Sequence, residues 1–387
     1  MRLTILSFIT LVFLTSCSDK QNISSETYIG TYRIMDQMVP YPFIIQQKKD
    51  TIYLYNNKGN SIDKITNTSI NKNKSLNFQE KHLKIIQKED DEFLAFDLLD
   101  TTNFKTFKNG NPSPKNSAKF KKIKSENKLD LQKVKKEIGK FIWKYDVVED
   151  ENSNPNNDLE IEKLFYFKND SLNIITNYYY QGLKTISEYE TKSYNIFVID
   201  NIYFLSLQKE SSNPQPIYQI VRYDSNKIEL RDFSSRVSKN IILHKESISV
   251  IDYTELAKNS SIYSNCFDGY QGEYYFGDDV TFNKGNEYII NYVNENIPKN
   301  ETNSGYLIVH FNINCSGKVG NFGLIQMNRD FKATAFSKEF VNHTINKVSK
   351  LEEFPASNSQ LEWLNYKDVH AFLMFKINNG KIVDVCP

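Results

Sequence analysis

The chain has 387 residues, enough for two or three domains that each bury a hydrophobic core. Its 48 Lys and Arg residues are balanced by 47 Asp and Glu residues, so the chain is close to neutral. A nucleic-acid-binding protein is expected to carry a basic field, and we therefore expect no nucleic-acid partner. The 24 Tyr and 26 Phe against only 14 Gly favour a mainly β chain, because aromatic residues fit a half-buried pleated surface.

The first 16 residues have the layout of a secretory signal. A basic start at Arg2 is followed by an apolar run over residues 3–14 and by two small residues, Thr15 and Ser16. The apolar run is about a dozen residues long, whereas a helix needs about 20 to cross the hydrocarbon core of a bilayer. We therefore interpret residues 1–16 as a cleaved signal peptide.

The sequence Leu14-Thr15-Ser16-Cys17 resembles the bacterial lipobox. The resemblance implies cleavage after Ser16 and lipidation of Cys17, with residues 17–27 as a tether to a membrane of the cell envelope. Two or more acyl chains anchor stably, because each buried methylene contributes about 0.8 kcal/mol. The alternative is a plain signal peptide with an incidental cysteine. Ser18, directly after the cysteine, resembles the sorting signal of outer-membrane lipoproteins. The sequence does not determine which face of the membrane carries the protein.

Residues 28–124 contain short runs of alternating apolar and polar side chains separated by turns, such as 51–55 and 93–96. This pattern predicts an antiparallel β module with one solvated face. Residues 125–140 are Lys-rich with helical spacing of apolar residues, which predicts a linker with a short helix. A second β module is expected over residues 141–255.

The two β modules are hypothesised to be diverged copies of one unit. The turn and strand at 48–54 parallel those at 168–174, and those at 90–94 parallel 200–204. Each copy resembles a lipocalin-like or small-barrel module, also on the basis of Gly30-Thr31-Tyr32 near the start. The alternative is that any two hairpins look alike at this level.

The pattern of apolar residues and turns in the last third of the chain, residues 260–387, predicts an α+β domain. Its expected order is helix, strand, strand, helix, strand. The first helix ends before Pro298, which disfavours helix at the preceding residue. The turn Ser316-Gly317-Lys318 joins the first two strands. The expected elements are residues 287–294, 305–314, 319–327, 336–351 and 369–377.

This order resembles the C-terminal domain of the energy transducer TonB. The matching features are Tyr292 to Pro298 ahead of Gly305, the turn before Val319, the sequence Phe354-Pro355-Ala356 after the second helix, and an aromatic last strand. The resemblance implies either a structural module or an exposed sheet edge that takes an extended peptide by strand addition. Energy transduction is not expected, because the chain has a lipobox and β modules in place of a transmembrane helix and a proline-rich stretch.

Three cysteines remain after lipidation of Cys17, namely Cys266, Cys315 and Cys386. In the fold that the resemblance implies, Cys315 and Cys386 lie at the ends of neighbouring strands, which makes them the candidates for a disulfide. A pairing of Cys266 with either of them stays open, because connectivity does not follow from sequence.

No catalytic, cofactor-binding or metal-binding site is predicted. The five histidines have no metal-ligand spacing, and we expect His310 and His370 to be structural. The acidic stretches at 90–92, 149–158 and 278–279 are interpreted as solvated turns rather than a calcium site or a carboxylate pair. The aromatic clusters at 178–180 and 274–276 are interpreted as β packing rather than a stacking platform for a ligand.

The sequence thus predicts a non-enzymatic envelope lipoprotein, mainly β with an α+β tail. We expect its partners to be the membrane, through lipid on Cys17, and an envelope protein or peptide. The alternative is a cell-wall or glycan hydrolase whose carboxylates lie far apart in sequence, which a buried pair about 5 to 9 Å apart would favour.

Overall fold

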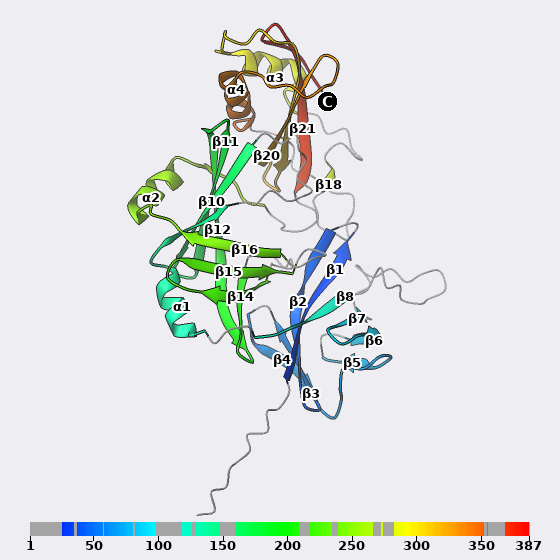
Figure 1. Ribbon diagram of the computed structural model, residues 1–387. Helices are drawn as coiled ribbons and strands as arrows, with labels where there is room; N and C mark the ends of the chain where they lie inside the picture. The colour runs from blue at the N-terminus through cyan, green and yellow to red at the C-terminus, as the bar shows by residue number, and fades with distance from the viewer. Residues whose placement is uncertain are drawn as a thin grey trace, which may run out of the picture.

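The computed structural model describes residues 25–34, 37–56, 58–79, 82–97, 118–125, 129–146, 159–208, 217–233, 239–265, 272–273, 282–351, 354 and 368–386. Within them the chain is mainly β, with antiparallel sheets that form barrel-like modules (Figure 1). No helix in this part of the chain is both long and apolar enough to span a membrane.

The first sheet is an eight-stranded antiparallel meander. Each strand pairs with its neighbour in sequence, except that β8 returns to pair with β1 and the pairing stops between β4 and β5. Its buried side chains, among them Tyr28 and Phe120, form one apolar core. The strands are β1 (Ser25–Ile34), β2 (Gln37–Lys48), β3 (Thr51–Asn56), β4 (Ser61–Ile65), β5 (Ser75–Asn77), β6 (His82–Lys88), β7 (Glu92–Asp97) and β8 (Ala118–Ile123).

The second sheet is an eight-stranded antiparallel meander that closes completely. β16 pairs with β9, and every other strand pairs with its sequence neighbour, so the strands form an up-and-down barrel. The short β17 (Ser261–Ile262) adds to β12 in parallel. The barrel strands are β9 (Ile142–Asp146), β10 (Leu159–Lys168), β11 (Ser171–Tyr180), β12 (Leu183–Ile199), β13 (Ile202–Gln208), β14 (Ile217–Tyr223), β15 (Lys227–Asp232) and β16 (Lys239–Lys245).

Two short helices cover this barrel. In α1 (Leu131–Ile138), which the sequence predicted, Val134 and Ile138 join the apolar core of the barrel, and the carbonyl of Ile138 accepts a hydrogen bond from Trp143 Nε1 at 2.8 Å. The other helix, α2 (Val250–Lys258), was not predicted, and it packs Tyr253 against the outer face of the barrel. In Figure 1, α1 lies at the end of the barrel away from the C-terminal sheet.

The two meanders have the same strand order, which supports the repeat hypothesis. The turn around Lys49 joins the second and third strands of the first sheet, and the turn around Asn169 joins the equivalent strands of the second sheet. Both residues have a positive φ, 55° and 48°. The second parallel is wrong, because 90–92 joins the sixth and seventh strands whereas 200–201 joins the fourth and fifth.

The C-terminal third has the predicted order of helix, strand, strand, helix, strand, and then one strand more. Both helices pack on one face of the sheet, where Ile289 and Phe340 meet Val309. The additional strand, β22, pairs with β21, and the two-residue β18 pairs with β21 in parallel. The elements are β18 (Gly272–Glu273), α3 (Gly285–Asn294), β19 (Gly305–Ile313), β20 (Val319–Asn328), α4 (Lys338–Val348), β21 (Val369–Asn378) and β22 (Lys381–Cys386).

Some backbone groups at the two edges of this sheet already form hydrogen bonds. On β22, the backbone N–H and carbonyl of Ile382 bond to the side-chain amide of Asn294, at 3.2 and 2.7 Å, and the carbonyl of Val385 accepts from Asn286. On β20, the carbonyl of Gln326 accepts a hydrogen bond from the backbone of Thr334. The TonB resemblance implied a three-stranded sheet with an open edge. The structure instead has a five-stranded sheet, and side-chain and backbone hydrogen bonds already use backbone groups at its edges.

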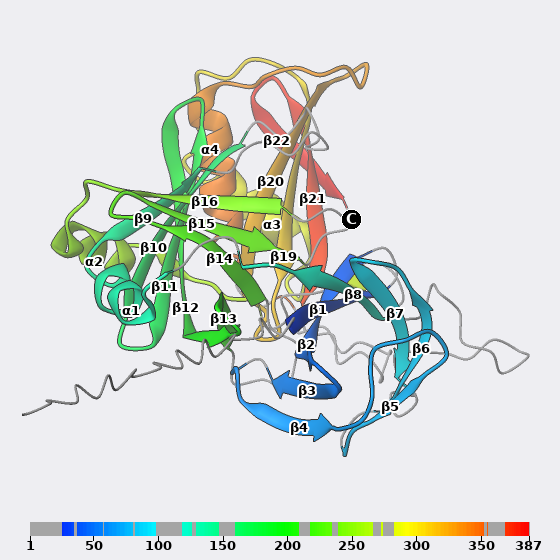
Figure 2. The same cartoon turned by 60° about the horizontal axis from the view of Figure 1, so that its bottom comes forward.

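The modules share hydrophobic cores across the predicted domain boundaries. Tyr178, Tyr180 and Ile186 of the second barrel belong to the core beneath the C-terminal sheet. On another side of the barrel, Phe197 packs in one cluster with Ile44 of the first sheet. Figure 2 shows the first sheet beside the barrel, with the C-terminal sheet behind. The domain limits themselves stay predictions.

Candidate functional site

The inner face of the second barrel changes from apolar to polar toward the C-terminal sheet. Leu172 and Ile174 of β11 belong to the apolar core of the barrel. Side chains two residues apart in a strand share a face, so Thr176 and then Tyr178 continue on that face. Tyr178 already belongs to the core beneath the C-terminal sheet. A polar band therefore separates two apolar cores.

Three neighbouring strands supply the side chains of this band. Thr176 on β11 is the register partner of both Lys163 on β10 and Glu188 on β12, so the three residues form a row. Glu190 and Lys192 follow on β12 at two-residue spacing and share the face of Glu188. The register thus gathers five polar side chains that are up to 29 positions apart in sequence (163 to 192).

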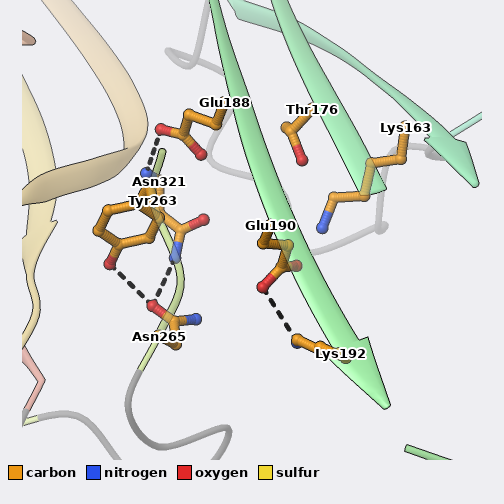
Figure 3. Close-up of a pocket in the computed structure, with 8 residues that line it drawn as sticks. All are labelled: Lys163, Thr176, Glu188, Glu190, Lys192, Tyr263, Asn265 and Asn321. Carbon is orange, nitrogen blue, oxygen red and sulfur yellow. Dashed lines mark hydrogen bonds and ion pairs between the residues drawn. The ribbon is translucent and has the colours of Figure 1, made fainter. Parts of the chain in front are cut away.

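These side chains line a cavity of about 150 Å³ at the end of the barrel (Figure 3). Three residues from beyond the barrel close the other side of the cavity, namely Tyr263, Asn265 and Asn321. Tyr263 and Asn265 follow β17, and Asn321 lies on β20. The cavity is therefore formed jointly by the barrel and the C-terminal sheet.

Glu188 is a buried carboxyl group in the wall of the cavity. Its Oε1 accepts a hydrogen bond from the backbone N–H of Asn321 at 2.9 Å, and its Oε2 accepts one from the hydroxyl of Tyr178 at 3.0 Å. Burial raises the pKa of Glu188 to about 7, although these two bonds and the charge of Lys163 act in the opposite direction. Glu188 is thus placed to change its protonation near neutral pH.

The other charged side chains of the cavity differ in their pairing. Lys192 Nζ lies 3.4 Å from Glu190 Oε2, so these two charges offset each other. Lys163 makes no hydrogen bond or ion pair with the residues that the structure describes, and neither does the hydroxyl of Thr176. Figure 3 shows the amino group of Lys163 pointing into the space between Thr176 and Glu190. An ammonium group and a hydroxyl group are therefore available to a ligand.

A hydrogen-bonded network holds the three closing residues in place. Asn265 Oδ1 accepts bonds from the hydroxyl of Tyr263 at 2.8 Å and from Asn321 Nδ2 at 3.1 Å. The ring of Tyr263 lies on Gly320, where a Cβ atom would come within 2.3 Å of the ring. Glycine at position 320 is thus required for this side of the cavity to close.

The predicted disulfide between Cys315 and Cys386 is wrong. Cys315 is disulfide-bonded, whereas Cys386 at the end of β22 is a free, exposed thiol. The prediction assumed that the last strand is the one over 369–377, which would place Cys386 near its end. β22 instead forms a hairpin with β21, and its last residue, Cys386, is the register partner of Met374. Cys17 and Cys266 lie outside the described residues.

Among the described residues, the aromatic and acidic groups that the sequence singled out do not line the cavity. Tyr178 and Tyr180 are buried in the core, as the packing interpretation predicted, and Tyr179 on the opposite face donates a hydrogen bond to Glu162 at 3.0 Å. Asp90 and Asp91 lie in an exposed turn, as predicted. The stretches at 149–158, 274–276 and 278–279 lie outside the described residues.

His310 and His370 occupy neighbouring strands of the C-terminal sheet and stack at a ring-centroid distance of 5.3 Å. They are half-buried and lie on the face away from the two helices, because Val309, Phe311 and Ala371 beside them face the core. They therefore lie on the face of the sheet opposite the core, and their expected structural role stays a prediction. No group of three His, Cys, Asp or Glu side chains that would hold a metal occurs among the described residues.

The pocket residues were missed because they look like the solvated face of a strand. Charges at every second position, Glu188, Glu190 and Lys192, are typical of a strand with one wet face. Only closure of the barrel turns this face inward. A signal was available in the length of β12, whose 17 residues exceed the usual span of a strand. No protein-family model matches this chain, and no curated protein matches it significantly.

Proposed function

We propose that this chain is a lipoprotein of the bacterial cell envelope, anchored on the outer membrane through Cys17, whose second barrel binds a small polar molecule without converting it. The anchor rests on the lipobox resemblance of residues 14–17. The binding role rests on one observation, the polar cavity of about 150 Å³ at the end of a closed barrel. Pockets for drug-sized ligands enclose about 300–1,000 Å³, so a smaller molecule fits this one.

A glycan hydrolase is the second candidate. Glu188 and Glu190 are two residues apart on one strand, which separates their Cα atoms by about 6.5 Å, and glycosidase carboxyl groups lie roughly 5 to 9.5 Å apart. A carboxyl group with a pKa of about 7 also suits a general acid. A glycan chain, however, needs a long open groove, whereas this site is a cavity of about 150 Å³ that Tyr263, Asn265 and Asn321 line on one side. Binding therefore has the better support.

Strand addition to the C-terminal sheet has less support than binding in the pocket. The side chains of Asn294 and Asn286 form hydrogen bonds with backbone groups of the outer edge of β22. At the opposite edge, the backbone of Thr334 and the carboxylate of Glu188 form hydrogen bonds with backbone groups of β20. A peptide strand would have to displace these contacts at either edge.

The anchor is tested by metabolic labelling with an alkyne analogue of palmitate in a bacterial host. We expect the full chain to be labelled and found in the outer-membrane fraction, and Cys17→Ala to lose both properties. Cys386→Ala is the matched control, because it removes a free, exposed thiol and should keep both. Labelling that persists in Cys17→Ala, or that is absent from the unaltered chain, contradicts the anchor.

The binding role is tested by thermal shift of the purified protein against small acids, amines, sugars and alcohols. A compound that binds the native state raises the midpoint of unfolding, because at free concentration c it stabilises that state by RT ln(1 + c/Kd). Glu188→Gln with Glu190→Gln decides between the two candidates, since a hydrolase loses all turnover of glycan fragments when both carboxylates are removed. If the unaltered chain turns over glycan fragments and the double variant does not, the protein is a hydrolase and the proposed binding role is wrong.

A further inference from the structure

The pocket contains several hydrogen-bond donors that make no bond to the residues that the structure describes. Both oxygens of Glu188 already accept bonds, from Asn321 and Tyr178. Glu190 is paired with Lys192. The ammonium group of Lys163 retains three N–H donors, and the hydroxyl of Thr176 retains one.

Asn265 adds a further donor on the closing side. Its Oδ1 accepts two bonds, from Tyr263 and Asn321, which leaves its side-chain NH₂ as the unused part of the amide. Lys163 and Asn265 belong to opposite sides of the cavity, the barrel and the segment after β17. A ligand between them meets N–H groups from both sides.

From this inventory we infer that the ligand of the pocket carries a small oxyanion, a carboxylate or a phosphate, held by Lys163, Thr176 and Asn265. This inference rests on the proposed binding function and names the chemistry of its ligand. Charge-assisted bonds from ammonium and amide N–H groups to an oxyanion are the strong hydrogen bonds of proteins. A neutral or cationic ligand cannot accept charge-assisted bonds of this kind from the ammonium group of Lys163.

The charge of the cavity changes with the protonation of Glu188. The groups that face it are Lys163 on β10, Tyr178 on β11, Glu190 and Lys192 on β12, and Tyr263 after β17. With Glu188 protonated, two ammonium groups face one carboxylate and the cavity carries one positive charge. With Glu188 ionised it is neutral. An oxyanion therefore binds better to the protonated form, and we expect affinity to fall as the pH rises through about 7, the pKa of Glu188.

The test is calorimetric titration of the protein with sodium acetate and, separately, with inorganic phosphate, at pH 6 and pH 8. We expect at least one of the two to bind, and to bind more weakly at pH 8, with proton uptake near pH 7. The two titrations distinguish a carboxylate site from a phosphate site. Phosphate itself also ionises near pH 7, which changes its affinity. Glu188→Gln is the control for this effect, because it loses only the part of the pH dependence that is due to Glu188.

Lys163→Met should weaken binding by about tenfold to a hundredfold, the effect of losing one hydrogen bond to a charged group. Lys163→Arg keeps the charge and should retain most of the affinity, which distinguishes a role in binding from a role in folding. Lys168→Met is the matched control, because Lys168 is an exposed lysine at the end of the same strand. Circular dichroism confirms that each variant is folded.

Two results overturn the inference. One is that neither acetate nor phosphate binds at either pH, and the other is that Lys163→Met binds as well as the unaltered protein. If neither anion binds but erythritol or ethanolamine binds in a way that Glu188→Ala abolishes, a small-molecule pocket stays in place and its ligand is neutral or cationic. Absence of binding by all four compounds removes both the inference and the support for the proposed function.

Discussion

The carboxylate of Glu188 on β12 accepts a hydrogen bond of 2.9 Å from the backbone N–H of Asn321 on β20, 133 residues further along the chain. This bond joins the second barrel to the C-terminal sheet. Asn321 has a φ of 56°, in the left-handed region that asparagine tolerates better than most residues. One buried acid thus lines the pocket and also connects two parts of the fold.

Glu188 should make stability depend on pH near neutrality. Its pKa rises from 4.5 to about 7 on folding, so between these values the folded state binds more protons than the unfolded state. The contribution of Glu188 to stability is then fully present below pH 4.5 and falls as the pH rises toward 7, by at most about 1.4 kcal/mol per pH unit. Urea unfolding of the unaltered protein and of Glu188→Gln from pH 5 to 8 should show this slope only in the former. Equal slopes contradict the prediction.

Glu162 should contribute to stability in the opposite pH direction. Burial by itself would raise the pKa of Glu162, but hydrogen bonds from Asn177, Lys144 and Tyr179 outweigh it and hold the pKa below its usual value. The contribution is therefore present above the unfolded pKa of 4.5 and is lost as the pH falls through the folded value. We expect Glu162→Gln to cost about 1–2 kcal/mol at pH 7.

The same substitution should cost less at pH 3 than at pH 7, because the contribution of the ionised carboxylate falls as the pH falls through its lowered folded pKa. Glu160→Gln is the control, since Glu160 is exposed on the same strand and its substitution should be neutral at both pH values. A loss of stability in Glu162→Gln that is as large at pH 3 as at pH 7 points to packing and not to charge.

Gly320→Ala should open the pocket side formed by Tyr263. A Cβ atom at position 320 would come within 2.3 Å of the ring, so the ring must move. We expect a loss of about 1–3 kcal/mol, the usual cost of overpacking. Tyr263→Leu removes the ring and should reduce that loss when the two changes are combined, which a double-mutant cycle measures. Additive effects show that the glycine matters for another reason.

The disulfide partner of Cys315 should be Cys266. Cys386 is a free thiol, and Cys17 is the predicted lipidation site. Asn314 Nδ2 donates a hydrogen bond to the carbonyl of Ser264 at 3.1 Å, so the chain next to Cys315 lies against the segment that leads to Cys266. Peptide mapping without reduction should yield a cross-linked pair of peptides containing Cys266 and Cys315. A pair containing Cys386 refutes both the pairing and the free thiol.

Much of the local structure followed from sequence periodicity. The helices and strands of the last third lie within about two residues of most predicted limits, because Pro298 and Gly317 mark the breaks and the apolar spacing between them is regular. α2 was missed, since its hydrophobic face is narrow and only Tyr253 is buried. β22 was missed as well, and with it the position of Cys386.

The site itself depended on contacts between distant parts of the chain. Alternation along β12 determines that Glu188, Glu190 and Lys192 share a face, but not whether that face is wet or enclosed. Pairing of β16 with β9 and of β11 with β12 closes the barrel and makes the face internal. Tyr263 and Asn321 then come from outside the barrel to complete the cavity.

By itself, the sequence determined the mainly β character, the order of the C-terminal elements and the turns that separate the strands, because these depend on neighbours a few residues apart. The tertiary structure alone decided which charged side chains became buried. Burial is a property of the closed barrel and of the sheet packed on its end, and Glu188 and Asn321 meet only when both have formed.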